Sequence, residues 1–146
     1  MGSLNVPASG TVYLDTNTII YAVERIEPYR TLLEPLWHAA VQQQITLVTS
    51  ELTWLETLVK PFRDNNTQLE TLFRSFLTAQ EMNLVPATLP IWEQAARLRG
   101  VGLKTPDAVH AATGLAVGCS LFLTNDPIFQ RVALLPVTIL NIVLNS

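Results

Sequence analysis

Short apolar segments rich in β-branched residues alternate along this chain with longer segments of helical periodicity, and this alternation constrains the fold most strongly. The short segments predict strands at residues 11–15, 45–49, 84–86, 120–124 and 137–141. The longer segments predict helices at residues 32–43, 50–59, 66–81, 90–99 and 105–118. Strands that alternate with helices through short connections form a parallel sheet with helices on both faces. We therefore predict one α/β domain over residues 11–146, with a central parallel five-stranded sheet flanked by helices, after an N-terminal tail of residues 1–10.

Start and stop signals support several of these boundaries. Ser50 is a good N-cap for the helix after the second strand, and Pro61 is expected to stop that helix. Thr105 and Pro106 place a cap residue and a proline at the start of a later helix, which is a preferred arrangement. The longest apolar run, residues 132–144, is shorter than the roughly 20 residues that span a membrane. We interpret it as core strand and predict no membrane contact.

Composition narrows the functional class. Hydrophobic residues make up 49% of the 146 residues and charged residues only 14%, whereas typical globular domains have about 25% charged residues. This excludes an intrinsically disordered chain and suggests apolar surface that a partner covers. Cys119 is the single cysteine, which excludes a disulfide framework and favours a reducing, cytoplasmic location. The net charge of −3 argues against a broad basic face for nucleic acid.

Acidic side chains follow the predicted strands where a parallel sheet binds its ligands. Asp15 ends the first strand, and Asp126 lies just beyond the fourth. Glu56 lies two turns into the helix after the second strand. Asp107 lies in the first turn of the helix that begins at Thr105, where the helix dipole favours an anion. Because ligands bind beyond the carboxyl ends of such strands, we expect these four acids to face one cleft.

Converging carboxylates repel one another. Two unit charges about 5 Å apart, at an effective dielectric near 20, cost roughly 3 kcal/mol. Four carboxylates in one cleft therefore need a divalent metal, or a proton shared between two acids as in aspartic proteases. Acids without a nearby histidine suit a hard ion, Mg²⁺ or Mn²⁺, better than zinc. Such an ion activates water and clamps a phosphodiester during its displacement.

Other polar residues near the acids are weaker candidates. His110 follows Asp107 by about one helical turn and could assist a proton transfer, although a hydrogen-bonded structural histidine is the commoner case. Four basic residues flank the helices that carry Glu56 and Asp107, and they are candidates for phosphate contacts: Lys60, Arg63, Arg99 and Lys104. A solvated surface position is the usual alternative for each of them.

Four motifs follow one another along the chain: Leu14-Asp15-Thr16-Asn17, the helix from Ser50 to Glu56, residues 105–112, and Leu123-Thr124-Asn125-Asp126. In this order they resemble the PIN domain family, and their spacing is similar to that of the VapC-type ribonuclease toxins of bacterial toxin–antitoxin pairs. The resemblance covers residues 11–141. It implies a five-stranded parallel sheet and an acidic pocket that binds one or two Mg²⁺ or Mn²⁺ ions. It also implies cleavage of RNA, inhibition by a cognate VapB-type antitoxin, and homodimers.

The resemblance further implies roles for individual residues. The four acids of the family are matched, in order along the chain, by Asp15, Glu56, Asp107 and Asp126. All four acids would form the metal site, in which the three aspartates hold the ion and Glu56 orients or deprotonates the attacking water. This attack leaves a 5′-phosphate and a 3′-hydroxyl. Asn17 and Thr124 match polar positions that line the pocket. The alternative hypothesis is a non-catalytic PIN-like interaction module, whose acids bind a structural ion or a basic partner peptide.

Overall fold

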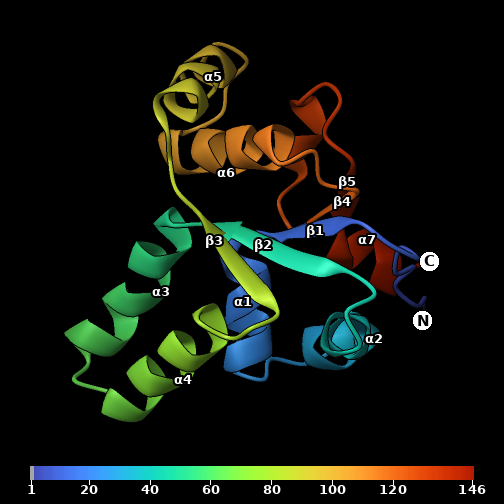
Figure 1. Ribbon diagram of the computed structural model, residues 1–146, viewed down its shortest axis with the longest axis vertical. Helices are drawn as coiled ribbons and strands as arrows, with labels where there is room; N and C mark the ends of the chain where they lie inside the picture. The colour runs from blue at the N-terminus through green and yellow to red at the C-terminus, as the bar shows by residue number, and fades with distance from the viewer. Residues whose placement is uncertain (1) are drawn as a thin grey trace.

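The strands form one parallel sheet in the order β3-β2-β1-β4-β5 in the computed structural model of the chain, which describes residues 2–146 (Figure 1). The strands are β1 (Thr11–Leu14), β2 (Thr46–Ser50), β3 (Met82–Val85), β4 (Leu121–Thr124) and β5 (Val137–Ile139). β1 lies in the middle, and the chain crosses from β3 at one edge to β4 on the other side of β1. The predicted α/β class with a five-stranded parallel sheet is confirmed.

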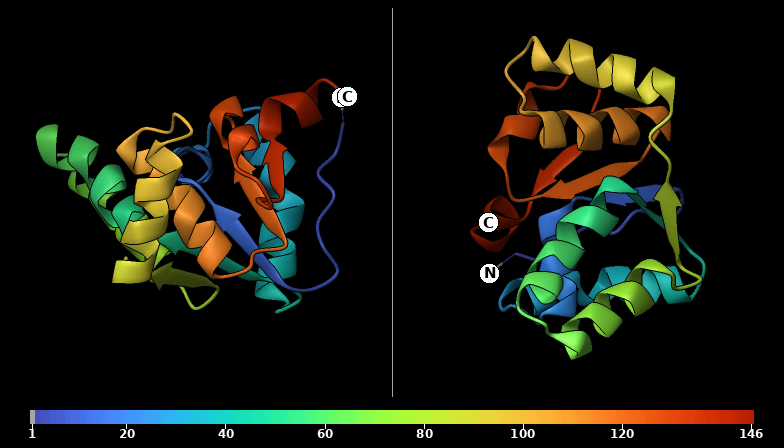
Figure 2. Two further views of the ribbon diagram at one scale, coloured as in Figure 1. Left: turned by 90° about the horizontal axis from the view of Figure 1, so that it is seen from above. Right: turned by 90° about the vertical axis from the view of Figure 1, so that its left-hand side faces the viewer.

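Helices cover both faces of this sheet. They are α1 (Thr16–Val23), α2 (Tyr29–Val41), α3 (Leu52–Arg63), α4 (Thr67–Leu77), α5 (Leu89–Arg99), α6 (Thr105–Ala116), the 3-10 helix η1 (Pro127–Arg131) and α7 (Leu140–Leu144). Helices α5 and α6 lie on one face, and α1 to α4 lie on the other (Figures 1 and 2). Within residues 2–146, no helix has the length and apolar character needed to cross a bilayer.

Successive strand residues point into two separate hydrophobic clusters, one on each face of the sheet. Val12 and Leu14 of β1 belong to the cluster that contains α1 and α2 residues, whereas Tyr13 between them belongs to the cluster under α5 and α6. Leu123 and Phe122 of β4 divide in the same way. This period of two, with both faces apolar, explains why the strands read as continuous apolar runs in the sequence.

Helix α1 is not predicted by the sequence pattern. It has only eight residues and includes five β-branched ones, which lower helix propensity. Asp15 begins this helix, because its side chain accepts a hydrogen bond from the backbone N–H of Thr18. Thr18 and Ile19 are buried against the sheet. The N-cap and tertiary packing therefore stabilise α1, which has no long amphipathic pattern of its own.

The prediction of core strand over residues 132–144 is wrong except at β5. Residues 132–136 form a turn and the irregular segment that leads into β5, and residues 140–144 form α7. The backbone N–H of Asn141, in the first turn of α7, donates to Oδ1 of Asn125 at 2.8 Å. Asn125 belongs to the loop after β4, so a side chain from another part of the chain satisfies an N–H that a short helix leaves unpaired.

Two helix ends also differ from the prediction. Pro61 does not stop α3, which continues to Arg63. The proline lies in the last turns, where it removes one backbone hydrogen bond but leaves most of the helix intact. Helix α4 ends at Leu77 rather than at residue 81, because the chain must reach β3, which begins at Met82 and pairs with β2.

The segment before β1, residues 2–10, contains no helix or strand. Leu4 is buried in the cluster that also contains Leu140. The side-chain amide of Gln44 donates to the carbonyl of Pro7 at 2.9 Å. Gly2 lies directly against Val143 of α7. The two ends of the described chain therefore meet beside α7, as Figure 1 shows.

Candidate active site

Two of the predicted acids follow adjacent strands. Asp15 comes directly after β1 and is the N-cap of α1, and Asp126 comes two residues after β4 and is the N-cap of η1. β1 and β4 pair in parallel, so both acids lie at the same edge of the sheet. Residues of α1 join the hydrophobic cluster on one face, whereas Phe129 of η1 joins the cluster on the other. The chain thus leaves the two strands toward opposite faces, which is the point of an open parallel sheet where ligands usually bind.

Asp15 is the most buried of the four acids, with a side chain that is 5% exposed. Its Oδ1 accepts hydrogen bonds from the backbone N–H and the hydroxyl of Thr18, at 3.0 and 2.8 Å. Its Oδ2 accepts a short hydrogen bond from the hydroxyl of Thr124. Burial raises the pKa of Asp15 above its usual value, although the hydrogen bonds from Thr124 and Thr18 oppose that shift. A positive charge beside Asp15 would therefore be strongly favoured.

Glu56 is held by two side chains from other elements. Its Oε1 accepts a hydrogen bond from the hydroxyl of Thr16 at 2.7 Å and lies 2.8 Å from Nε2 of His110. Burial would raise the pKa of Glu56, but the hydrogen bonds from His110 and Thr16 outweigh it, and the pKa is lowered. Glu56 is therefore an ionised carboxylate with a fixed Oε1.

Asp107 connects the four acids electrostatically. It lies half-buried in the first turn of α6. Its pKa is raised by burial first and then by the negative charges of Asp126, Asp15 and Glu56, while His110 partly opposes the shift. The predicted acids therefore lie within electrostatic range of Asp107. Thr124 links two of them directly, because its hydroxyl donates to Asp15 and accepts the backbone N–H of Asp126 at 3.1 Å.

The supporting residues include some that the sequence reasoning identified and some that it missed. Thr124 is fully buried between two acids. The side chain of Asn17 is exposed on α1, and it is the next residue, Thr18, that binds Asp15. Thr16 was also missed as a partner of Glu56. An N-cap aspartate accepts from the residue three positions later, so the spacing from Asp15 to Thr18 was the available signal.

The interpretation of the acids as lacking a nearby histidine is wrong, because His110 contacts Glu56 directly. The expectation that His110 is hydrogen-bonded within the fold is confirmed, and its side chain is 3% exposed. Its partner Glu56 is 54 positions away in the sequence. The packing of α3 beside α6 brings the two residues together, and no local pattern encodes that contact.

The four basic candidates differ in their positions and partners. Lys60 and Arg63 lie within the last turns of α3 rather than after it, and Arg99 and Lys104 precede α6 as predicted. Lys60 forms an ion pair with Glu24 at 2.8 Å, and Arg63 pairs with its neighbour Asp64 at 3.1 Å. Nη1 of Arg99 donates to the carbonyl of Leu103 at 3.4 Å. Lys104 is exposed at the N-cap of α6. Exposed ion pairs of this kind contribute little to stability, so these side chains can exchange their partners for a phosphate.

The carboxylate oxygens of the site are the ligands that a hard divalent cation prefers, but the acids lie too far apart to surround an ion by themselves. In residues 2–146, no group of three or more His, Cys, Asp and Glu side chains is arranged so that it could hold a metal ion by itself. Mg²⁺ usually keeps several waters and binds proteins through one or two carboxylates together with substrate phosphates. The acids around Asp107 therefore suit an ion that retains water rather than a closed cage of protein ligands.

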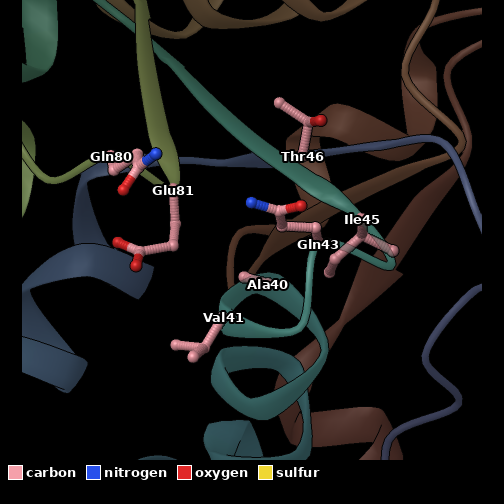
Figure 3. Close-up of a pocket in the computed structure, with 7 residues that line it drawn as sticks. All are labelled: Ala40, Val41, Gln43, Ile45, Thr46, Gln80 and Glu81. Atoms are coloured by element: carbon pink, nitrogen blue, oxygen red, sulfur yellow. The ribbon is translucent and has the colours of Figure 1, made fainter.

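A hollow at the opposite end of the sheet does not belong to this site. It has a volume of about 290 Å³ and is lined by Ala40, Val41, Gln43, Ile45, Thr46, Gln80 and Glu81 (Figure 3). Thr46 begins β2, and Glu81 immediately precedes β3. The hollow therefore lies at the amino ends of these strands, whereas Asp15 and Asp126 follow the carboxyl ends of β1 and β4.

Asp15→Asn is expected to increase the free energy of unfolding relative to the wild type. This difference between the two proteins should grow as the pH rises above about 4. Because burial raises the pKa of Asp15, the folded protein keeps this proton to a higher pH than the unfolded chain does. Between the two pKa values the folded state binds more protons, so the wild-type stability falls as the pH rises. Asparagine does not titrate and avoids this loss. Urea unfolding of both proteins in metal-free buffer, from about pH 4 to about pH 8, measures the difference. A difference that does not change with pH would contradict the raised pKa.

Comparison with known proteins identifies the family. The model of the PIN domain matches residues 12–135. No curated protein sequence matches the chain. Among solved structures, a chain of the VapBC2 complex from Rickettsia felis, bound to a DNA fragment from its promoter, has a TM-score of 0.70 at 19% identity, covering 88% of this chain and 97% of that chain.

Two further structures share the fold. A chain of a toxin–antitoxin complex from Klebsiella pneumoniae has a TM-score of 0.63 at 21% identity and covers 87% of this chain and 95% of that one. A chain of DNA-bound VapBC from Salmonella typhimurium has a TM-score of 0.65 at 15% identity, with 88% and 96% covered. These likenesses show the shared fold, and the match to the family model spans most of the chain, including all four acids. The chain therefore belongs to the PIN domain family.

Proposed function

We propose that this protein is a metal-dependent endoribonuclease that acts in the cytoplasm as the toxin of a toxin–antitoxin pair. The observation that carries the proposal is that Thr124 joins Asp15 and Asp126 by hydrogen bonds where the adjacent strands β1 and β4 end, with Glu56 and Asp107 within electrostatic range. Carboxylates gathered at the carboxyl ends of parallel strands need a cation to stay ionised together. Membership of the PIN domain family supports a nuclease as the function that such a site serves.

The residues divide into two roles. Asp15, Asp107 and Asp126 would hold one or two Mg²⁺ or Mn²⁺ ions. When bound, such an ion lowers the pKa of water and neutralises charge on a phosphate. Glu56 would orient the attacking water through its carboxylate, because this group is ionised and its Oε1 is already held by Thr16 and His110. An ionised carboxylate can also accept the proton of that water. Attack on the phosphodiester by water leaves a 5′-phosphate and a 3′-hydroxyl.

The substrate contacts come from the surface around the acids. Four basic residues are proposed to contact RNA phosphates, namely Lys60, Arg63, Arg99 and Lys104. Basic side chains neutralise phosphates whatever the nucleotide sequence is. Bound divalent ions would make the acidic cleft itself attractive to phosphate. The net charge of −3 is therefore compatible with an RNA substrate.

A VapB-type antitoxin and a second copy of the chain are the proposed protein partners. The fold neighbours in Rickettsia felis and Salmonella typhimurium are VapBC complexes, and the neighbour in Klebsiella pneumoniae is a toxin–antitoxin complex. On α3, Leu55, Val59 and Phe62 are 60%, 53% and 53% exposed. Their spacing places them on one side of the helix, which supports a surface that a partner covers. An arginine from the antitoxin could pair with the acids and block the site.

Removal of divalent cations is expected to reduce RNA cleavage at least about 100-fold, because the ion activates the water and neutralises the phosphate. Cleavage of a mixed panel of structured RNAs is measured in EDTA and again after Mg²⁺ or Mn²⁺ is restored. The same ions should raise the melting temperature, because they bind the folded state and reduce repulsion among its acids.

Two outcomes would contradict this proposal. Cleavage at an undiminished rate in EDTA would exclude the metal-dependent chemistry. If the panel is not cleaved with either ion, the alternative becomes the better account, namely a non-catalytic module whose acids bind a structural ion or a basic peptide. Titration with a basic peptide would then test that alternative directly.

A further inference from the structure

A buried tyrosine and a buried histidine join the elements that carry three of the four acids. The hydroxyl of Tyr13 in β1 lies 2.6 Å from Nδ1 of His110 in α6. It also accepts the backbone N–H of Ser50 at 3.2 Å, where β2 leads into α3. Both side chains are at most 3% exposed. One hydroxyl therefore links β1, the end of β2 and α6. Asp15 follows β1, Glu56 lies in the helix α3 that follows β2, and Asp107 lies in α6.

The hydrogen-bond partners determine which ring nitrogen of His110 carries the proton. Nε2 lies 2.8 Å from Oε1 of Glu56, and an ionised carboxylate only accepts hydrogen bonds, so Nε2 is the donor. The Tyr13 hydroxyl already accepts the N–H of Ser50, so its own proton points to Nδ1, which is then the acceptor. A phenol is protonated at neutral pH, so the Tyr13 hydroxyl has a proton to donate.

We propose that His110 is a positioning residue, which Tyr13 holds as the Nε2–H tautomer so that it fixes Oε1 of Glu56 and keeps Oε2 for the attacking water. The proposal rests on the proposed ribonuclease function. Among the described residues, Oε1 of Glu56 receives both hydrogen bonds, from Thr16 and His110, and Oε2 receives none. A carboxylate held through one oxygen presents the other in a defined direction, which is the usual task of a residue that supports a reactive group.

Two substitutions separate the contact with Glu56 from the contact with Tyr13. The side-chain amide of glutamine reaches about as far as Nε2 of histidine, so His110→Gln retains a donor for Glu56. The shorter amide of asparagine corresponds to Nδ1, so His110→Asn retains a partner for Tyr13 but loses the bond to Glu56. Both variants place a polar amide in the same buried position, which makes each a control for the other.

We expect His110→Asn to lower kcat for RNA cleavage about 10- to 100-fold, with KM changed less than about threefold. His110→Gln should stay within about fivefold of the wild-type kcat. Melting temperatures of the two variants should be similar, because each buries one amide. If both variants lose kcat equally, or lose it only in proportion to a lower melting temperature, His110 has a purely structural role and the proposal is overturned.

A measurement without metal or RNA tests the same contact. The ¹⁵N chemical shifts of His110 in the metal-free wild-type protein should show a proton on Nε2 and none on Nδ1, and Glu56→Gln should shift the Nε2 resonance. Tyr13→Phe keeps the ring stacked on Phe122 and should shift the Nδ1 resonance, because Nδ1 loses its hydrogen-bond donor, while Glu56 keeps the proton on Nε2. A ring protonated at Nδ1, or a resonance unaffected by Glu56→Gln, overturns the proposal. A wild-type protein that cleaves no RNA contradicts the proposed function instead, while the NMR result still decides the Tyr13–His110–Glu56 contact.

Discussion

Asp15→Asn is expected to reduce Mg²⁺-dependent RNA cleavage by about a thousandfold, because it removes the buried charge at the centre of the acidic site. Asparagine has the shape of aspartate and keeps an oxygen that accepts the backbone N–H of Thr18, so α1 retains its N-cap. The hydroxyl of Thr124 would meet an amide in place of Oδ2, which it can accept from instead of donating to. The loss should therefore fall on the chemical step and on metal binding rather than on folding.

The measurement compares initial rates of cleavage at saturating Mg²⁺, together with urea unfolding of each protein. The matched control is Asp64→Asn, the same change at an exposed aspartate that pairs with Arg63 on the surface. We expect the control to cleave RNA within about threefold of wild type, since exposed ion pairs contribute little. If Asp15→Asn cleaves as fast as the control, Asp15 has no role in the reaction.

Phe122→Ala is expected to reduce the free energy of unfolding by about 3–5 kcal/mol, which is a large share of the roughly 5–15 kcal/mol that stabilises a typical domain. Phe122 is fully buried in the centre of β4. Its ring stacks on Tyr13 with centroids 4.7 Å apart and packs against Phe129 at 4.8 Å. Gly114 of α6 lies so close that a Cβ there would come within 2.8 Å of this ring. The space left by alanine is therefore bounded by several rigid elements and cannot collapse easily.

Urea or thermal unfolding measures this loss, and Phe62→Ala provides the same change at a side chain that is 53% exposed. The control should lose less than about 1 kcal/mol. Because Phe122 supports Tyr13, and Tyr13 contacts His110, any folded Phe122→Ala protein should also cleave RNA more slowly. A stability loss no greater than that of the control would show that the contacts on this face of the sheet do not limit folding.

The strands were predictable because burial on both faces leaves a strong signal in the sequence. Strand residues that belong to a buried hydrophobic cluster must be apolar, as are Val12, Leu14, Leu47 and Leu123. Strand-end aspartates were predictable for a related reason, because a charged residue directly after such a run must lie at the rim of the sheet. Helix α1 was not predictable, since its eight residues are stabilised by a cap and by burial rather than by propensity.

The sequence by itself determined the α/β class, the order of the strands along the chain, and which acids are available at the carboxyl ends of those strands. Only the tertiary structure decided which side chains support those acids. His110 contacts Glu56, 54 positions away in the sequence, and Thr124 contacts Asp15, 109 positions away. The side chain of Asn125 accepts a hydrogen bond from the first turn of α7, 16 positions away. Periodicity reports the face on which a residue lies, because the repeat of a helix or strand is local. The partner on that face is set by how separate elements pack, and no local repeat contains that information.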